Sequence, residues 1–273
     1  MTTLGRHIMK STLLKPSSTR QWLKPISFLP DPAGAVGMPW GIRQIAFKDD
    51  YQYVTSFNKA GRVGGYASLM AVLPDVNMGW SATAAGKMPE TLTGFIADEA
   101  ARRFLRVWQD VAREEAQTNY GGRYAAAAAG FNSSLEVQTF ADQPGIQITS
   151  WLSNGTDMRV WGVTFGQALN AEDLAKLRPN VTLYPTGLEE TLADGGKKVV
   201  FRAVFENMVG EKVSNSYVTD CITWIYTNAI YGSKPLDLFV FTLDRNGKAT
   251  AVENEALRAK LDKVPSAKER LVR

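Results

Sequence analysis

One long helical pattern divides this chain into two parts that both contain mainly strand patterns. Between Gly94 and Asn119, apolar residues recur at helical spacing: Ile96, Ala100, Phe104, Val107, Trp108 and Val111. Asp98 and Glu99 suit the positive end of the helix dipole, and Gly121-Gly122 ends the pattern. A helix that is long and amphipathic needs a partner surface. We therefore expect this apolar stripe to pack on a sheet formed by the residues before it.

The residues before this helix predict three neighbouring strands. Their spans are Tyr51–Asn58, Tyr66–Leu73 and Met78–Ala85. Glycines and a Pro-Asp turn make the connections short, so we expect an antiparallel meander. Upstream, Leu4, Ile8, Leu13 and Leu14 form a helical stripe that begins close to Met1. A second short helix is predicted through Trp22, capped by Ser17 or Ser18, and Leu29–Pro39 is predicted to be a loop.

The residues after Gly122 predict a mainly β domain. The expected strands are Leu135–Phe140, Ile146–Trp151, Val160–Phe165, Val181–Tyr184, Lys198–Phe205, Tyr217–Tyr226 and Leu238–Leu243. Many short strands with turn residues between them indicate a small barrel or sandwich. The fold class is therefore α+β, with a sheet-and-helix domain over residues 1–119 and a β-rich domain over residues 120–273.

The charge distribution argues against nucleic acid and membrane partners. The net charge is +4, but Lys and Arg are scattered among nearly as many Asp and Glu. The densest basic stretch, Lys260–Arg273, contains Asp262 and Glu269 and is predicted to be a solvated tail. No apolar run reaches the roughly 18 residues that a membrane-spanning helix needs.

The cysteine and histidine content restricts the chemistry. The single cysteine, Cys221, excludes a disulfide within the chain and is expected to be a buried, inert thiol. The single histidine, His7, is expected on an exposed helix surface rather than in a catalytic triad or zinc site. We expect no metal and no cofactor.

The sequence gives two opposing indications of where the protein is located. Met1–Lys10 contains no continuous apolar segment of the kind found in secretory signals, so the chain as written is expected in the cytoplasm. Three glycosylation triplets point weakly toward a secreted ancestor. They are Asn132-Ser-Ser, Asn154-Gly-Thr and Asn180-Val-Thr.

The segment Asn58–Tyr66 places a lysine at the end of a strand and glycines at the next hairpin. The order Lys59-Ala-Gly, Gly65-Tyr66, Leu73-Pro-Asp and Ala85-Gly86 resembles the fungal β-lactamase-like proteins of the serine β-lactamase, penicillin-binding protein and esterase superfamily. In that family a Lys-(Ser/Thr)-Gly strand precedes a small-residue strand ending in Pro-Asp. Three later segments are similar to the family's C-terminal β domain: Asn119–Tyr124, Thr149–Gly155 and Tyr231–Phe241.

The resemblance implies roles for three residues of a serine hydrolase site. Lys59 would support proton transfer and attract a substrate carboxylate, and Gly61 would leave space beside it. The backbone N–H of Arg62 would be one of two oxyanion donors. One position departs from the family, because Ala60 replaces the hydroxyl residue that hydrogen-bonds substrate.

The family's nucleophile motif, Ser-x-x-Lys on a helix, is expected to be missing. Only 58 residues precede Lys59, fewer than the family needs. Ser56-Phe-Asn-Lys59 matches the motif formally, but residues three apart on a strand point to opposite faces. Tyr226-Thr-Asn228 matches the family's Tyr-x-Asn formally but follows Lys59 instead of preceding it.

These observations lead to three hypotheses. The first is a truncated β-lactamase-like hydrolase that is inactive alone. Its sheet would be exposed, so the chain is expected either to be poorly soluble or to bind a complementary chain that covers the sheet. The second is a small-ligand or protein-binding β domain whose pocket is lined by aromatic residues: Trp151, Trp161, Tyr184, Trp224 and Tyr231. The third is an acyl hydrolase, acting on lactams or esters, that is completed by missing N-terminal sequence or a partner chain.

Overall fold

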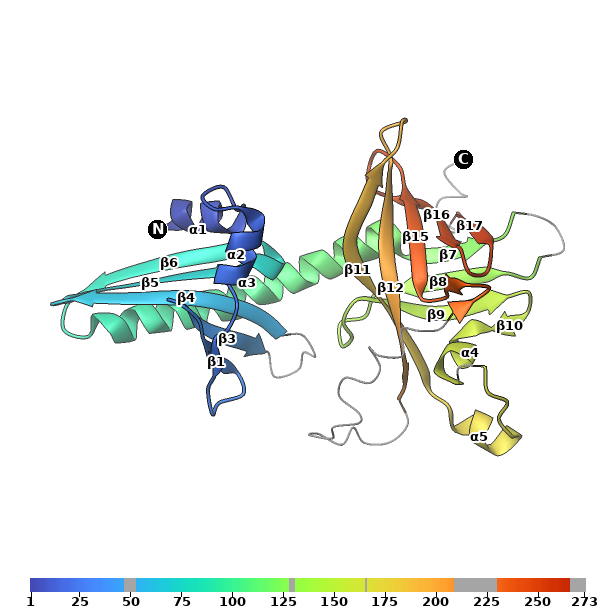
Figure 1. The fold of residues 1–273 in the computed structure, drawn as a ribbon, viewed down its shortest axis with the longest axis horizontal. Coiled ribbons are helices and arrows are strands. Elements are labelled where there is room, and N and C mark those ends of the chain that lie inside the picture. Colours follow the sequence, from blue (N-terminus) through green and yellow to red (C-terminus); the bar gives the residue numbers. More distant parts are fainter. Residues whose placement is uncertain (47–52, 128–130, 165, 209–229, 266–273) are drawn as a thin grey trace. The chain divides into compact units, whose positions relative to one another are not determined.

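The chain forms two compact units, Met1–Asp110 and Val111–Arg273. The computed structural model describes residues 1–46, 53–127, 131–164, 166–208 and 230–265. Helix α3 (Pro89–Tyr120) contributes residues to both units (Figure 1). The antiparallel sheets and the helices that pack on them confirm the α+β fold class.

The first unit contains one antiparallel sheet in the order β1-β2-β3-β4-β5-β6. Its strands are β1 (Ser27–Phe28), β2 (Gly34–Val36), β3 (Gly41–Ala46), β4 (Tyr53–Val63), β5 (Tyr66–Leu73) and β6 (Met78–Ala85). A 3-10 turn, η1 (Pro74–Val76), joins β5 to β6. The predicted meander is confirmed, with β5 and β6 at the expected bounds. The predicted loop over Leu29–Pro39 is wrong in part, because it contains β2.

Two short helices cover one face of this sheet. They are α1 (Thr2–Met9) and α2 (Pro16–Trp22). Ile8 is buried in a cluster with Phe57, Met70 and Val72 of the sheet. No side chain caps α2, whose N-cap residue is Lys15, so the predicted serine cap is wrong.

Helix α3 covers the opposite face with a different stripe from the predicted one. Ala101 and Leu105 are buried against the sheet, and Trp108 packs beside them. The predicted stripe is wrong at four positions, which remain exposed in the structure: Ile96 (40%), Phe104 (58%), Val107 (60%) and Val111 (57%). The small side chain of Ala101 allows the helix to approach the sheet closely, which a stripe of larger residues would not.

The second unit is a closed antiparallel β-barrel. The strand order is β9-β11-β12-β15-β16-β17-β7-β8, and β8 pairs back with β9. The strands are β7 (Gly122–Ala125), β8 (Ser134–Gln138), β9 (Ile146–Ser153), β11 (Pro179–Thr191), β12 (Lys197–Asn207), β15 (Leu238–Leu243), β16 (Ala249–Asn254) and β17 (Ala259–Lys263). Three shorter strands are β10 (Thr156–Asp157), which pairs antiparallel with the end of β9, and β13 (Ile230–Tyr231) with β14 (Lys234–Pro235). The barrel alternative is thus confirmed (Figure 1).

Aromatic side chains fill much of the barrel core. Tyr124, Phe239 and Phe241 are almost completely buried, and Phe241 makes edge-to-face contacts with Tyr124 and Phe201. The hydroxyl of Tyr124 donates a hydrogen bond to the carbonyl oxygen of Tyr120 at the end of α3. Burial, followed by the nearby Tyr120, raises the pKa of the Tyr124 phenol.

The predicted strand Val160–Phe165 is wrong, because this segment forms helix α4 (Met158–Thr164). Gly162 is buried against Phe205 of β12, and Met158 enters the barrel core. A short apolar run fits a buried strand or a buried helix equally well, and here the glycine allows close helix packing. A further short helix, α5 (Ala171–Lys176), follows.

The predicted solvated tail is also wrong at its beginning. Residues up to Lys263 belong to β17, with Leu261 buried in the barrel core. The predicted strand Tyr217–Tyr226 lies outside the described residues.

Candidate functional site

The three residues of the predicted site lie on the last part of β4. Strand β3 pairs with β4 only as far as Asn58, whereas β5 pairs with β4 to its end at Val63. Lys59, Gly61 and Arg62 therefore lie on a strand end with no partner on its outer side among the described strands. All three residues are exposed.

The register of the hairpin formed by β4 and β5 determines the direction of the backbone N–H and C=O groups at this end of β4. The Gly86 N–H donates to the Gly65 carbonyl, so odd-numbered residues of β5 direct their polar groups to β6 and even-numbered ones to β4. Tyr66, which pairs with Val63, consequently exchanges hydrogen bonds with it across the turn. Because backbone orientation alternates, the N–H of Arg62 points to the open outer side of β4.

Lys59 and Gly61 lie on the sheet face that α1 and α2 partly cover. They alternate with Arg62, which lies on the α3 face. The Lys59 ammonium donates a hydrogen bond of 2.6 Å to the Ala60 carbonyl oxygen. This contact folds the lysine side chain over the outer edge of the strand, next to the Arg62 N–H.

The missing side chain of Gly61 leaves the hydroxyl of Ser68 accessible, a residue that we did not predict as part of the site. A Cβ at this position would lie 3.5 Å from the Oγ of Ser68, its cross-strand partner on β5. Ser68 is half-buried, and the missing side chain at Gly61 keeps its hydroxyl accessible beside Lys59. Only the pairing register of the hairpin reveals this neighbour, because the resemblance assigns Ser68 no role.

The side chain of Arg62 has a structural role separate from its backbone. Its guanidinium forms an ion pair with Glu90 in the first turn of α3 and donates a hydrogen bond of 3.2 Å to the Gly64 carbonyl. The ion pair links the end of β4 to α3, whereas the hydrogen bond stays within the turn between β4 and β5. The backbone N–H of Arg62 remains directed outward.

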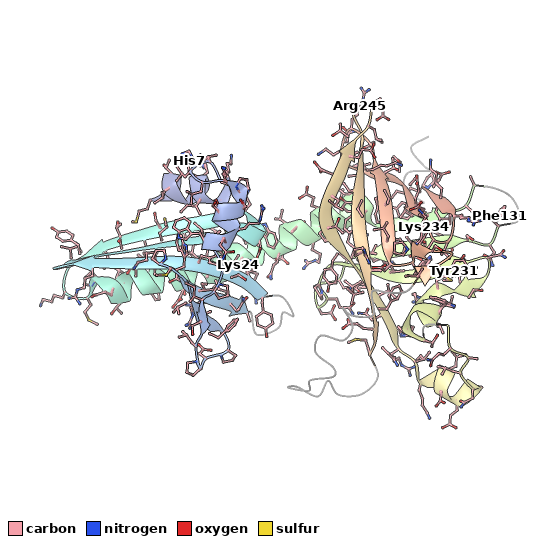
Figure 2. All side chains as sticks on the ribbon, viewed as in Figure 1. His7, Lys24, Phe131, Tyr231, Lys234 and Arg245 are labelled. Carbon is pink, nitrogen blue, oxygen red and sulfur yellow. The ribbon has the colours of Figure 1, made fainter. Side chains whose placement is uncertain are left out.

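The formal Ser-x-x-Lys match does not have the geometry of a catalytic pair. Ser56 is buried at 4% exposure on the α3 face, whereas Lys59 is exposed on the other face of β4. The other formal match, Tyr226-Thr-Asn228, lies outside the described residues, as does Cys221. His7 is exposed on α1, where its Nδ1 lies 2.6 Å from the Thr12 hydroxyl (Figure 2).

One carboxylate in the barrel unit is completely buried. Asp237 accepts a hydrogen bond from the Nε of Arg202 through one oxygen, and its other oxygen has no partner among the described residues. Burial raises the pKa of the Asp237 carboxyl, although the hydrogen bond and charge of Arg202 act in the opposite direction. Asp237 lines neither of the two cavities described for the barrel unit.

A shallow cleft of about 430 Å³ lies beside α4 and α5. Its lining is mainly apolar and includes Trp161, Leu174 and Leu177, with Asp157 and Gln167 as polar members. Of the other aromatic residues predicted to line a pocket, Trp151 is buried in the barrel core, Tyr231 is exposed, and Trp224 lies outside the described residues. Burial, followed by the charge of Glu206, raises the pKa of Tyr184.

The described residues contain no group of three His, Cys, Asp or Glu side chains that could hold a metal ion. Within the same residues, no helix has both the length and the apolar character needed to cross a membrane.

Comparison with known proteins connects the barrel unit to a family. A solved structure, the octameric penicillin-binding protein homologue from Pyrococcus abyssi, aligns with 12% identity and a TM-score of 0.29 over 76% of this chain. The chain spans 41% of the length of that protein. A search of curated proteins found no match.

The model of a family described as "Beta-lactamase-like-like, C-terminal domain" matches residues 112–265. The match covers more than half of the 273 residues and nearly all of the barrel unit. Through this domain, the chain belongs to the beta-lactamase-like family.

Proposed function

We propose that the chain supplies one wall of an acyl-transfer site of a β-lactamase-like serine hydrolase and is inactive alone. The main support for this proposal is the open strand end Lys59–Val63. It combines the exposed ammonium of Lys59 with an outward-facing backbone N–H at Arg62. Such donors stabilise the oxyanion that forms when a hydroxyl attacks an acyl group. The fungal origin implied by the resemblance stays a prediction.

The nucleophile in this proposal comes from a complementary segment, either of a longer protein or of a partner chain. The sequence has one Ser-x-x-Lys, and its serine is buried on the wrong face of β4. Acyl transfer needs a serine whose proton a neighbouring lysine can accept. A second segment carrying that pair would complete the site opposite Lys59.

Two surfaces of the first unit support the presence of such a segment. Strand β6 ends the sheet, and its residues Met78–Ala85 include no charged residue and no proline to block pairing with another strand. The exposed apolar stripe of α3 contains Ile96, Phe104 and Val107. We propose that the complementary segment adds a strand to β6 and packs on this stripe.

A fluorophosphonate probe tests the proposal, because it labels activated serines covalently. We expect no labelling of the isolated chain. In the assembly purified from its own cells through a tag on this chain, we expect labelling of a serine in a Ser-x-x-Lys motif outside residues 1–273. Labelling of a serine within these residues would overturn the proposal.

Two lysine variants make the test specific for the proposed site. Lys59→Ala should slow labelling of the assembly about 100-fold or more, the range typical for loss of a proton-transfer group. Lys87→Ala removes another exposed lysine, which follows the end of β6, and should leave the rate unchanged. Equal rates for the two variants would exclude Lys59 from the site.

The cleft beside α4 and α5 favours a second candidate function, binding of a small apolar ligand by the barrel unit. Its volume lies in the range of small-molecule sites, and Trp161 provides an aromatic surface. Native mass spectrometry of the purified chain should then detect a bound molecule. Leu174→Ser, an exposed position on α5, should release the molecule without changing the melting temperature of the ligand-free protein.

A further inference from the structure

The three Asn-x-Ser/Thr triplets have different surroundings in the folded barrel unit. Asn154 and Gly155 form the two-residue turn between β9 and β10, with φ values of +48° and +85°. Asn154 is exposed, and its backbone N–H donates to the Ser133 hydroxyl at 3.0 Å. Its side-chain amide forms no hydrogen bond with any described residue. A group attached to its Nδ2 would therefore extend into solvent.

Asn132 lies beside this turn, although it is distant in sequence. Its carbonyl oxygen accepts a hydrogen bond of 2.8 Å from the Gly155 N–H. Asn132 is exposed, and its side chain makes no hydrogen bond to another described residue. The preceding Phe131 is 66% exposed and projects from the barrel unit (Figure 2). The two asparagines thus share one accessible surface, which includes an uncovered aromatic ring.

Asn180 differs from both, because it lies within strand β11. It is half-buried, and its Nδ2 donates to the Thr182 hydroxyl at 3.4 Å. Thr182 is only 2% exposed and donates in turn to Gln147 at 3.0 Å. A substituent would replace one of the two hydrogens on the Asn180 Nδ2 and, because this residue is half-buried, would have to displace the residues that cover it.

We propose that Asn132 and Asn154 are N-glycosylated and that Asn180 is not. In this modification the asparagine Nδ2 forms a bond to the anomeric carbon of an oligosaccharide and loses one proton. The bond from that carbon to the pyrophosphate of a lipid-linked donor breaks, and the lipid pyrophosphate leaves. The proposal places the chain in a secretory compartment, where Asn-x-Ser/Thr triplets are modified. The attached sugars would cover Phe131.

Enzymatic release of N-glycans in heavy-oxygen water tests the proposal on protein isolated from its own cells. Release converts each modified asparagine into an aspartate carrying heavy oxygen, which peptide mass spectrometry locates. We expect the label at residues 132 and 154 and an unlabelled Asn180. Label at Asn180, or an unlabelled residue at 132 or 154, would overturn the corresponding assignment.

Matched variants separate glycosylation from effects on folding. Asn132→Gln and Asn154→Gln should each remove one glycan from the mass of the protein, and Asn180→Gln should remove none. Thr156→Ala destroys the second triplet without changing Asn154, whereas Thr156→Ser preserves it. We expect loss of one glycan only in the alanine variant, and the same glycan count in both would overturn the assignment of Asn154. None of these results depends on the hydrolase site.

Discussion

Gly162 of α4 lies so close to Phe205 that a Cβ on the glycine would fall 2.2 Å from a ring carbon. This contact holds the helix against strand β12, one of the barrel strands. Since no real Cβ tolerates such a distance, an added methyl group must displace the ring or the helix.

The variant Gly162→Ala should therefore destabilise the barrel unit. Overpacking of a buried contact costs about 1–3 kcal/mol in unfolding free energy. Gly94→Ala is the matched control, because Gly94 lies in α3 with no atom within 4 Å of an added Cβ. It should raise stability by about 0.5–1 kcal/mol through helix propensity. Urea unfolding of both variants measures these differences, and equal midpoints would contradict the packing described for α4.

Truncation of two neighbouring residues of α3 should change the unfolding free energy by very different amounts. Leu105 is completely buried against the sheet, so Leu105→Ala should cost about 2–5 kcal/mol. Phe104 is 58% exposed, so Phe104→Ala should change the stability of the isolated chain by no more than about 0.5 kcal/mol. Thermal and urea unfolding test the pair. A large loss in Phe104→Ala would show that the exposed stripe is covered in the isolated chain.

The buried carboxyl of Asp237 should make stability depend on pH. Because its folded pKa is raised above the ordinary value of 3.8, the folded state holds a proton that the unfolded state has released. Its favourable contribution is present below pH 3.8 and is lost as the pH rises through the folded pKa. Relative to Asp237→Asn, the wild-type chain should lose stability over this interval, by at most about 1.4 kcal/mol per pH unit.

Urea unfolding of both proteins at several pH values measures this difference. The exposed Asp262→Asn on β17 provides the control for the loss of one negative charge. A wild-type advantage over Asp237→Asn that grows with pH would mean that Arg202 dominates over burial and would contradict the raised pKa.

A charge on the free edge of the sheet should improve solubility. Thr83 is exposed on β6, so Thr83→Lys places an ammonium on an edge strand of the sheet, where a charge disfavours pairing with another chain. Thr191→Lys adds the same charge on strand β11 of the barrel unit. Light scattering of the concentrated chain should fall in the first variant and stay near the wild-type value in the second. Equal effects would point to net charge rather than to the edge.

Local sequence patterns predicted the elements whose apolar and polar residues alternate between clear turns. Strands β5, β6 and β15 have the predicted bounds, because one sheet face is buried in each and glycine, proline or aspartate follows or precedes them. Strand β17 was missed because Leu261 alone faces the core among charged neighbours. The composition of such a strand is the same as that of a solvated tail, and only its pairing with β16 and β7 identifies it as a strand.

The remaining differences arise from tertiary packing that local periodicity does not contain. Helix α3 has two apolar stripes, and its sheet contact uses the one with Ala101 and Leu105 rather than the larger residues around Phe104. The position of Ser68 beside Lys59 depends on hairpin register across two strands. The resemblance was enough to name the residues of the candidate site. That they lie on an open strand edge could be recognised only once the extent of the pairing between β3 and β4 was known.

Strand β8 pairs with both β7 and β9, so the ring of hydrogen bonds in the barrel has no beginning or end. Every strand in that ring pairs with a described neighbour on each side, although β11 meets β9 through only two residues, Thr182 and Leu183. A unit built this way can be joined to different neighbours without changing its own interior. Residues 111–265 therefore have the physical properties of a transplantable module.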